Sequence, residues 1–208
     1  MRRELLRCLL GLLLLVALVV PAVAQQGMPS AKAAMDVASL KVISENANRW
    51  IDLAGTAIKM PNKKDLFMEV SLQCGLFKDS ATATPIDDAG VQVRVLVNGV
   101  EAQARRIVYC RKTQALAPFA GLQSCTNASG EMFFSSCTMS STERTSVLRS
   151  VVGNSFGFVL VDLTPGVYHI KVQARIDKGT SPESGMIRAV VGKGPATVED
   201  VRMINHNP

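Results

Sequence analysis

Two segments of this 208-residue chain alternate apolar and polar residues with a period of two. The apolar members of the first segment are Leu66, Met68, Val70, Leu72 and Cys74, and those of the second are Val91, Val93, Val95 and Val97. Successive side chains of a β-strand point to opposite faces of the sheet, so both segments predict strands with one buried face. The pattern predicts an all-β protein, an antiparallel β-sandwich.

Asn98-Gly99 directly follows the second alternating segment. Both residues tolerate the positive φ that a type I′ turn requires, which predicts a tight hairpin. A two-residue turn pairs Val97 with Val100. If the returning strand continues without a bulge, it places Val108 and Cys110 on the core face.

The first 24 residues have the features of a secretory signal peptide. Three arginines precede an apolar run from Leu9 to Val20, and a small-x-small cleavage pattern ends at Ala24, before Gln25. The run is shorter than the ~20 residues of a bilayer-spanning helix. Cys8 precedes the run, whereas a lipidated cysteine would follow it. We therefore expect an exported protein, periplasmic or extracellular, with no stable membrane anchor after cleavage.

Removing residues 1–24 leaves about 184 of the 208 residues, the usual size of one domain. We expect an N-terminal arm at 25–49, either a short helix or a segment that orders on docking. A single sandwich domain follows at 50–208, with an insertion at 112–150. The formal charge of +6 includes +2 from the signal. The remaining charge is too small for a nucleic-acid-binding footprint.

Four cysteines remain after signal cleavage: Cys74, Cys110, Cys125 and Cys137. An even number in an exported chain predicts two disulfides. The rival reading is a zinc site, but the chain has no C-x2-C pair and only two histidines. Parity places Cys74 and Cys110 on the core face at strand ends. We therefore predict the pair Cys74–Cys110, and the pair Cys125–Cys137 within the insertion.

The insertion is rich in Ser, Thr and Cys and contains the apolar cluster Met132, Phe133 and Phe134. This cluster is expected to anchor the insertion in the core; the alternative is an exposed contact patch. Residues 156–163 are expected to form a buried strand. The single tryptophan, Trp50, is interpreted as a core or edge plug.

Residues 162–174 (DLTPGVYHIKVQA) resemble the corner before the penultimate strand of fibronectin type III and other immunoglobulin-like domains. In that family a Leu and a Pro-Gly turn precede a tyrosine whose hydroxyl returns to the backbone. The resemblance extends over residues 159–191. It implies an immunoglobulin-like sandwich in which Tyr168 forms the tyrosine corner.

Gly153-Asn154-Ser155-Phe156-Gly157 matches G-x-S-x-G, the nucleophile elbow of α/β-hydrolases. The elbow needs a strand that turns sharply into a helix, but the residues after the motif have a strand-like sequence. The alternating strands and long helices of that fold are also missing. We favour a glycine-flanked turn leading into a strand. A serine hydrolase using Ser155 is kept as the alternative function.

Several basic residues are expected to project from strand faces opposite the core, among them Arg94, Arg105, Lys171 and Arg175. If those strands share a sheet, the basic residues form a candidate anion-binding patch for anionic glycans, lipid headgroups or an acidic protein. An ordinary solvated face, with Glu101 interspersed, is the interpretation that the sequence favours.

The sequence thus predicts an exported, non-catalytic sandwich that acts as a binding or structural module in the bacterial envelope. Its partner would be an unidentified protein or an anionic envelope component. We expect no catalytic residues, no metal and no cofactor.

Overall fold

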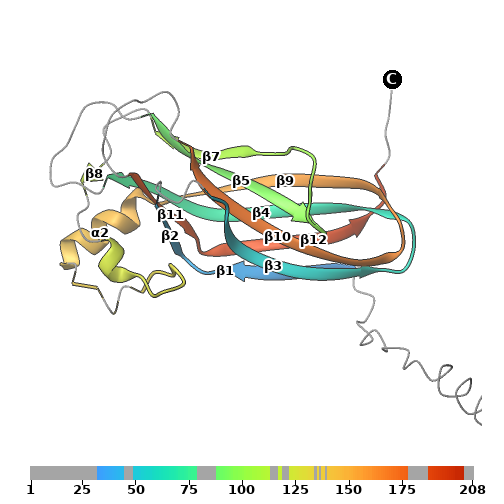
Figure 1. Cartoon of the computed structure of the whole chain (residues 1–208), viewed down its shortest axis with the longest axis horizontal. Helices are drawn as coiled ribbons and strands as arrows, with labels where there is room; N and C mark the ends of the chain where they lie inside the picture. The colour runs from blue at the N-terminus through green and yellow to red at the C-terminus, as the bar shows by residue number, and fades with distance from the viewer. Residues whose placement is uncertain are drawn as a thin grey trace, which may run out of the picture. The chain divides into compact units, whose positions relative to one another are not determined.

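A computed structural model describes residues 32–44, 49–78, 88–112, 117–118, 122–133, 135, 137–138, 140–177 and 187–203. The predicted signal peptide, residues 1–24, lies outside the described residues. The segment from residue 31 onward forms two mostly antiparallel sheets with a hydrophobic core between them (Figure 1).

The first sheet is built around the long strand β4. Its strands are β1 (Ala33–Ala38), β2 (Lys41–Ser44), β4 (Lys64–Lys78), β8 (Ala117–Pro118), β9 (Val152–Leu163), β11 (Ile187–Gly192) and β12 (Gly194–Val201). On one side, β4 pairs with β11 and β12, which pair in turn with β2 and β1. On its other side, β4 pairs with β9 and, in parallel, with the short β8.

The second sheet has β10 near its centre. Its strands are β3 (Ile51–Met60), β5 (Ala89–Val97), β6 (Val100–Glu101), β7 (Ile107–Lys112) and β10 (Gly166–Asp177). The order is β3-β10-β5, and β6 and β7 both pair with the free side of β5.

The strand order defines a jelly roll. β1 with β2, β6 with β7, and β11 with β12 each act as one interrupted strand, so the described chain contains eight long strands. Numbered along the chain, the first sheet has the order 1-8-3-6 and the second 2-7-4-5. This is the two-sheet arrangement of a jelly roll, in which the chain passes repeatedly between the sheets. The all-β sandwich is confirmed, and its order differs from the ABED and CFG sheets of immunoglobulin domains.

The N-terminal arm is extended where the structure describes it, so the helical alternative for residues 25–49 is wrong there. β1 and β2 complete the edge of the first sheet by pairing with β12 and β11. Ala38 and Ile43 are each only 2% exposed. The arm therefore contributes to the core, and its backbone hydrogen bonds are made to the sheet.

Period-two alternation correctly located the core face of the first sheet. The five apolar residues of β4 from Leu66 to Cys74 are at most 2% exposed. The predicted buried strand at 156–163 behaves differently. It belongs to β9, at the edge of the sheet, where Phe158 is buried and Val161 is 40% exposed.

The predicted hairpin turn is present. Asn98 and Gly99 have φ of 49° and 84°, and Val97 pairs with Val100. The chain then leaves the sheet after β6 through Ala104 and Arg105, which have φ of 72° and 48°.

This excursion changes the parity of β7. Ile107 pairs with Val93, and a further register shift follows between Val91 and Gln92 of β5. The predicted burial of Val108 is therefore wrong, since its side chain is 40% exposed while that of Tyr109 is 2% exposed.

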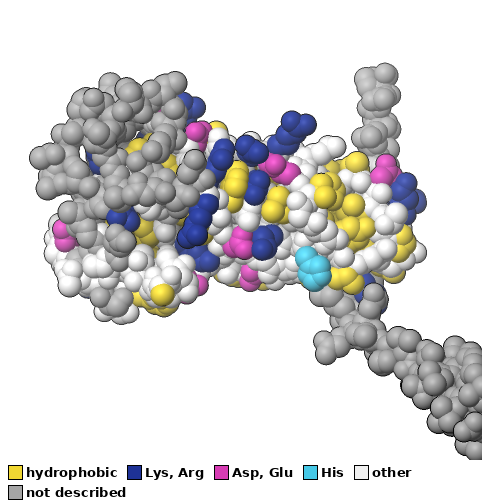
Figure 2. All heavy atoms as spheres, in the orientation of Figure 1, with side chains coloured by type: hydrophobic (Ala, Val, Ile, Leu, Met, Phe, Trp, Pro, Cys, Tyr) yellow, Lys and Arg dark blue, Asp and Glu magenta, His cyan; other side chains and the backbone are white. Residues whose placement is uncertain are grey.

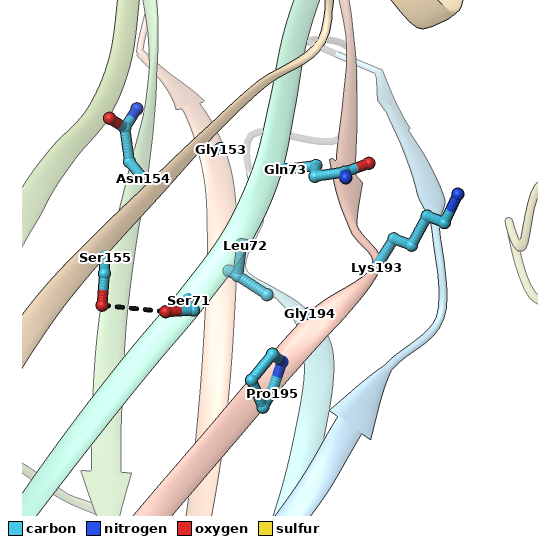
Figure 3. Close-up of a pocket in the computed structure, with 9 residues that line it drawn as sticks. All are labelled: Ser71, Leu72, Gln73, Gly153, Asn154, Ser155, Lys193, Gly194 and Pro195. Carbon is cyan, nitrogen blue, oxygen red and sulfur yellow. Dashed lines mark hydrogen bonds between the residues drawn. The ribbon is translucent and has the colours of Figure 1, made fainter.

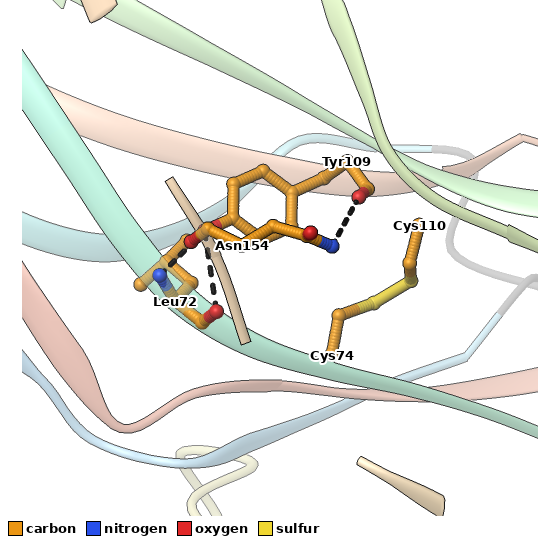
Figure 4. The surroundings of a disulfide bond; sticks show 5 residues. All are labelled: Leu72, Cys74, Tyr109, Cys110 and Asn154. Atoms are coloured by element: carbon orange, nitrogen blue, oxygen red, sulfur yellow. Dashed lines mark hydrogen bonds between the residues drawn. A yellow bond between two sulfur atoms is a disulfide. The ribbon is translucent and has the colours of Figure 1, made fainter. Parts of the chain in front are cut away.

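Two neighbouring residues of β7 attach it to the first sheet. Cys110 forms a disulfide with Cys74 of β4, with a Cα–Cα distance of 6.3 Å, which confirms the predicted pairing. The Tyr109 hydroxyl accepts a hydrogen bond from the Leu72 N–H (2.5 Å) and donates one to the Asn154 carbonyl of β9 (Figure 4). Burial raises the pKa of Tyr109 and keeps its hydroxyl protonated for this bond.

Tyr168 makes the contact that the tyrosine-corner resemblance implies. Its hydroxyl donates to the Thr164 carbonyl over 2.5 Å, across the Pro165-Gly166 turn that opens β10. This bond fixes the corner between β9 and β10.

The insertion covers one end of the outer face of the first sheet with a second apolar cluster. Its helical elements are the 3-10 helix η2 (Leu122–Cys125) and the helix α2 (Ser141–Ser150), which begins with a capping box between Ser140 and Glu143. The buried members of the cluster are Phe77, Leu122, Cys125, Met132, Cys137, Val147 and Val190. Met132 is thus an anchor as predicted, whereas Phe133 is 48% exposed. The side chain of Phe134 lies outside the described residues.

The structure differs from the predicted Cys125–Cys137 disulfide. Both cysteines are buried and neither is in a disulfide; their thiols are hydrogen-bonded to each other. Burial and this hydrogen bond raise the pKa of Cys125 to about 11. Disulfide exchange requires a thiolate, so a thiol held in its protonated form is slow to oxidise.

We expect the Tyr109 hydroxyl to contribute more to stability than the Tyr168 hydroxyl. Tyr109→Phe leaves the buried Leu72 N–H without its hydroxyl partner and removes the bond to the half-buried Asn154 carbonyl, which costs about 1–3 kcal/mol. Tyr168→Phe removes a bond at a more exposed site and should cost about 1 kcal/mol or less. Urea denaturation of the two variants measures the difference. Equal losses would contradict the role assigned to Tyr109.

The reduced Cys125 and Cys137 thiols are expected to react slowly with iodoacetamide. With a pKa of about 11 instead of 9.0, only about one Cys125 thiol in a thousand is ionised at pH 8, against roughly one in ten for an ordinary thiol. Alkylation followed by mass spectrometry should show a rate that rises about ten-fold per pH unit between pH 8 and 10. Denatured protein is the control. Rapid labelling of native protein at pH 8 would contradict the burial of these thiols.

Candidate anion-binding face

The outer face of the second sheet carries two cross-strand rows of polar side chains. In the first row, Gln173 of β10 lies opposite Arg94 of β5 and Asp52 of β3. In the second row, Arg175 of β10 lies opposite Gln92 of β5. Strand alternation directs these side chains away from the core, and the sheet register brings residues far apart in sequence side by side.

Hydrogen bonds within the rows hold both guanidinium groups in place. The Arg94 Nε donates to Gln173 Oε1 over 2.9 Å, and Gln173 Nε2 donates to Asp52 over 2.6 Å. The Nε and Nη2 of Arg175 both donate to Gln92 Oε1, over 3.0 and 2.9 Å. The terminal Nη groups of Arg94 have no hydrogen-bond partner among the described residues, so they are available for an acceptor from outside.

Trp50 lies against these guanidinium groups. The guanidinium carbons of Arg94 and Arg175 lie 4.2 and 4.7 Å from the centroid of the indole, and that of Arg106 lies 5.8 Å from it. Such distances allow cation–π attraction, which is stronger for Trp than for Tyr or Phe. The interpretation of Trp50 as a core or edge plug is therefore wrong: the ring is half-buried on the outer face.

Lys171 is close to this group but is neutralised by an ion pair. Its Nζ lies 2.9 Å from Asp52 Oδ2. Burial alone would raise the pKa of Asp52, but hydrogen bonds from Gln173 and Lys171 outweigh it and lower that pKa. Asp52 thus stays ionised near neutral pH, and Lys171 contributes little free charge.

Arg105 and Arg106 extend the basic surface along the β6–β7 connection. Arg106 Nε lies 3.4 Å from Glu101, whereas the exposed Arg105 side chain has no partner among the described residues. Figure 2 shows Lys and Arg side chains gathered on one face of the molecule, with acidic side chains between them. Further along, Arg111 is paired with Asp88 at 2.5 Å.

The structure thus brings together two of the four predicted patch residues, Arg94 and Arg175, around Trp50. Arg105 flanks them and Lys171 is largely compensated by Asp52. Sequence reasoning missed the central role of Trp50. The sequence carries no signal for this position, because Trp50 reaches the arginines only through the pairing of β3 with β10 and of β10 with β5.

Ser155 does not lie on a nucleophile elbow. It is within β9, where it pairs with Ser71 of β4, and the chain continues as strand beyond the motif, so the glycine-flanked turn is also absent. Its Oγ accepts a hydrogen bond from Ser71 Oγ (2.8 Å) and donates one to Glu69 (2.7 Å). His169 is exposed on β10 of the other sheet, and His206 lies outside the described residues. The geometry that lifts a serine toward a histidine base is missing.

Among the described residues, no cluster of three or more His, Cys, Asp and Glu side chains could hold a metal ion. None of the helices in the described ranges is long and apolar enough to cross a bilayer.

Comparison with known proteins assigns the chain to no family. No protein-family model matches the chain, and no curated protein sequence matches it. A structure of infectious bursal disease virus, Gx strain, is 11% identical with a TM-score of 0.40, and the match covers 90% of this chain and 39% of the viral chain.

Two other solved structures are more distant in shape. An aminopeptidase from a marine-sediment Thaumarchaeota archaeon is 14% identical with a TM-score of 0.30, covering 88% of this chain and 36% of its own. The Triatoma virus empty capsid is 12% identical with a TM-score of 0.20, covering 91% and 82%. These likenesses carry no functional argument, and the jelly-roll assignment rests on the strand order.

Proposed function

We propose that this chain is an exported, non-catalytic binding module that takes an anionic envelope component on the outer face of its second sheet. The observation that carries the proposal is the pair of guanidinium groups, Arg94 and Arg175, held against the half-buried indole of Trp50. Export is supported by the signal-like residues 1–24 and by the Cys74–Cys110 disulfide, since structural disulfides persist mainly in oxidising compartments.

The arrangement suits a carboxylate, sulfate or phosphate group. The planar guanidinium presents paired N–H donors that match the oxygens of such groups, and its ionisation persists at any physiological pH. Gln92 and Gln173 restrict the rotamers of both arginines, which lowers the entropy cost of ordering them on binding. Arg105, whose side chain has no partner among the described residues, adds charge beside this pair, so a ligand with several anionic groups gains a further contact.

The non-catalytic part of the proposal is supported by the setting of Ser155. Its hydroxyl is hydrogen-bonded within a strand face, and no described histidine lies on the same sheet face. Cross-strand hydrogen bonds fix the polar groups of the second sheet's outer face to one another. A rigid face of this kind supports a binding function.

Trp50 provides a direct readout, because it is the only tryptophan in the chain. Titration with alginate, a polyuronate, should change its fluorescence in a saturable and salt-sensitive way, while uncharged dextran should not. Arg94→Gln with Arg175→Gln should weaken alginate binding roughly ten-fold or more, since two charge-assisted hydrogen bonds at a half-exposed surface contribute on the order of 1.4 kcal/mol together.

Arg149→Gln with Arg202→Gln is the matched control, because it removes the same charge from α2 and from the exposed residue that follows β12 of the other sheet. It should leave alginate affinity within about two-fold, as expected for long-range charge screened by salt. Polyglutamate, titrated in parallel, separates an acidic protein partner from a glycan. If the two double variants lose affinity equally, or if no polyanion alters Trp50 fluorescence, the proposed face is wrong.

A further inference from the structure

A β-bulge interrupts the first sheet on the side of the sandwich opposite Trp50. Between the pairs Gly192–Gln73 and Ala196–Val70, the β11–β12 strand has three residues where β4 has two. The extra residue lies between the end of the β4–β11 ladder and the start of the β4–β12 ladder. Bulges of this kind redirect a side chain and are enriched beside binding sites.

The bulge presents Lys193 in a left-handed conformation with φ of 49°. Its N–H donates to the Ala38 carbonyl over 2.9 Å, which fixes the backbone. The flanking glycines are required by space: a Cβ on Gly192 would overlap the Ser39 carbonyl oxygen, and one on Gly194 would overlap that of Ser71. A left-handed backbone conformation costs a non-glycine residue roughly 1 kcal/mol or more, so the backbone of Lys193 is strained.

Beside Lys193 lies a shallow hollow of about 390 Å³ (Figure 3). It extends over β4 from the bulge to β9, and Gly153 and Gly194 leave its flanks without side chains. Its floor is fixed, because the Tyr109 hydroxyl bridges the backbones of Leu72 and Asn154 beneath it. The volume is within the range of small-molecule sites, which usually measure ~300–1,000 Å³.

The two ends of the hollow differ in the hydrogen-bonding groups that they offer. At one end, the Lys193 ammonium and the Gln73 amide have no partner among the described residues, and both side chains lie on the same side of the sheet (Figure 3). At the other end, Ser71 donates to Ser155, and Ser155 donates to Glu69. Both hydroxyl hydrogens are thus used, and this end offers only acceptor oxygens.

We propose that this hollow binds a monosaccharide-sized polyol that carries one carboxylate. The carboxylate would meet Lys193 and Gln73, and ligand hydroxyls would donate to Ser71 and Glu69. The Pro195 ring supplies an apolar edge for the carbon skeleton. This site is separate from the anion-binding face, and neither proposal depends on the other.

The test is titration of the ¹⁵N-labelled purified chain with D-glucuronate, followed by backbone amide NMR. Saturable shifts are expected at Gly153, Ser155, Lys193 and Gly194, with no matching change at the Trp50 indole N–H. Lys193→Gln should weaken binding at least ten-fold, while Arg149→Gln, which removes a charge elsewhere, should not change it. D-glucose and acetate should each bind at least ten-fold more weakly than glucuronate.

Lys193→Gly is the second variant, because glycine adopts positive φ without strain and keeps the bulge intact. It should lose glucuronate binding as Lys193→Gln does. The proposal is overturned if shifts are absent or centre on Arg94 and Trp50, or if either Lys193 variant binds like the parent. Acetate binding as tightly as glucuronate would also overturn it, since the hollow would then hold an anion only.

Discussion

Tyr109 and Cys110 attach β7 of the second sheet to the first sheet. Cys110 is bonded to β4 through the disulfide, and the neighbouring Tyr109 hydroxyl is hydrogen-bonded to β4 and β9. The disulfide limits how far the segments that form β4 and β7 can separate in the unfolded chain. The Tyr109 hydroxyl satisfies a donor on β4 and an acceptor on β9, so removing it takes away the partner of the buried Leu72 N–H. β7 itself has only β5 as a ladder partner, and without these links it would be a short edge strand.

The same links position the basic residues. The excursion between β6 and β7 carries Arg105 and Arg106, and it is held on one side by the hairpin turn and on the other by Tyr109. In its middle, the Gln103 N–H donates to the Val159 carbonyl of β9 over 2.8 Å. At the opposite edge, Asp36 of β1 accepts a bond from the Gly55 N–H of β3 over 2.8 Å. Both lateral edges of the sandwich are thereby joined, which limits edge-to-edge association.

Features set by local physics could be predicted from the sequence: the core face of β4 from its alternation, the Asn98-Gly99 turn and the Tyr168 bond. The Cys74–Cys110 pair was predicted from a strand without a bulge, and it holds because the excursion and the later register shift together restore the parity at Cys110. Burial of Tyr109 in place of Val108 could not, because the excursion depends on positive φ at Ala104 and Arg105, residues that give no turn signal. The strand order is also non-local, since a jelly roll and an immunoglobulin sandwich share the same alternation. The start of helix α2 could also have been predicted from the sequence, since Ser140 and Glu143 have the spacing of a capping box. For the candidate site, the outward arginines were predicted, but the position of Trp50 depends on which strands neighbour β3.

The most direct test of this account is the urea stability of Cys74→Ala with Cys110→Ala, followed by Trp50 fluorescence. The two cysteines are 36 residues apart, and chain entropy for a loop of that length gives a stabilisation of about 3–4 kcal/mol. The account predicts a loss of about that size, with the native fluorescence of Trp50 altered because the β6–β7 excursion that carries Arg106 is no longer anchored covalently. A loss below about 1 kcal/mol with unchanged Trp50 fluorescence would show that the attachment of β7 does not govern the sandwich or its basic face.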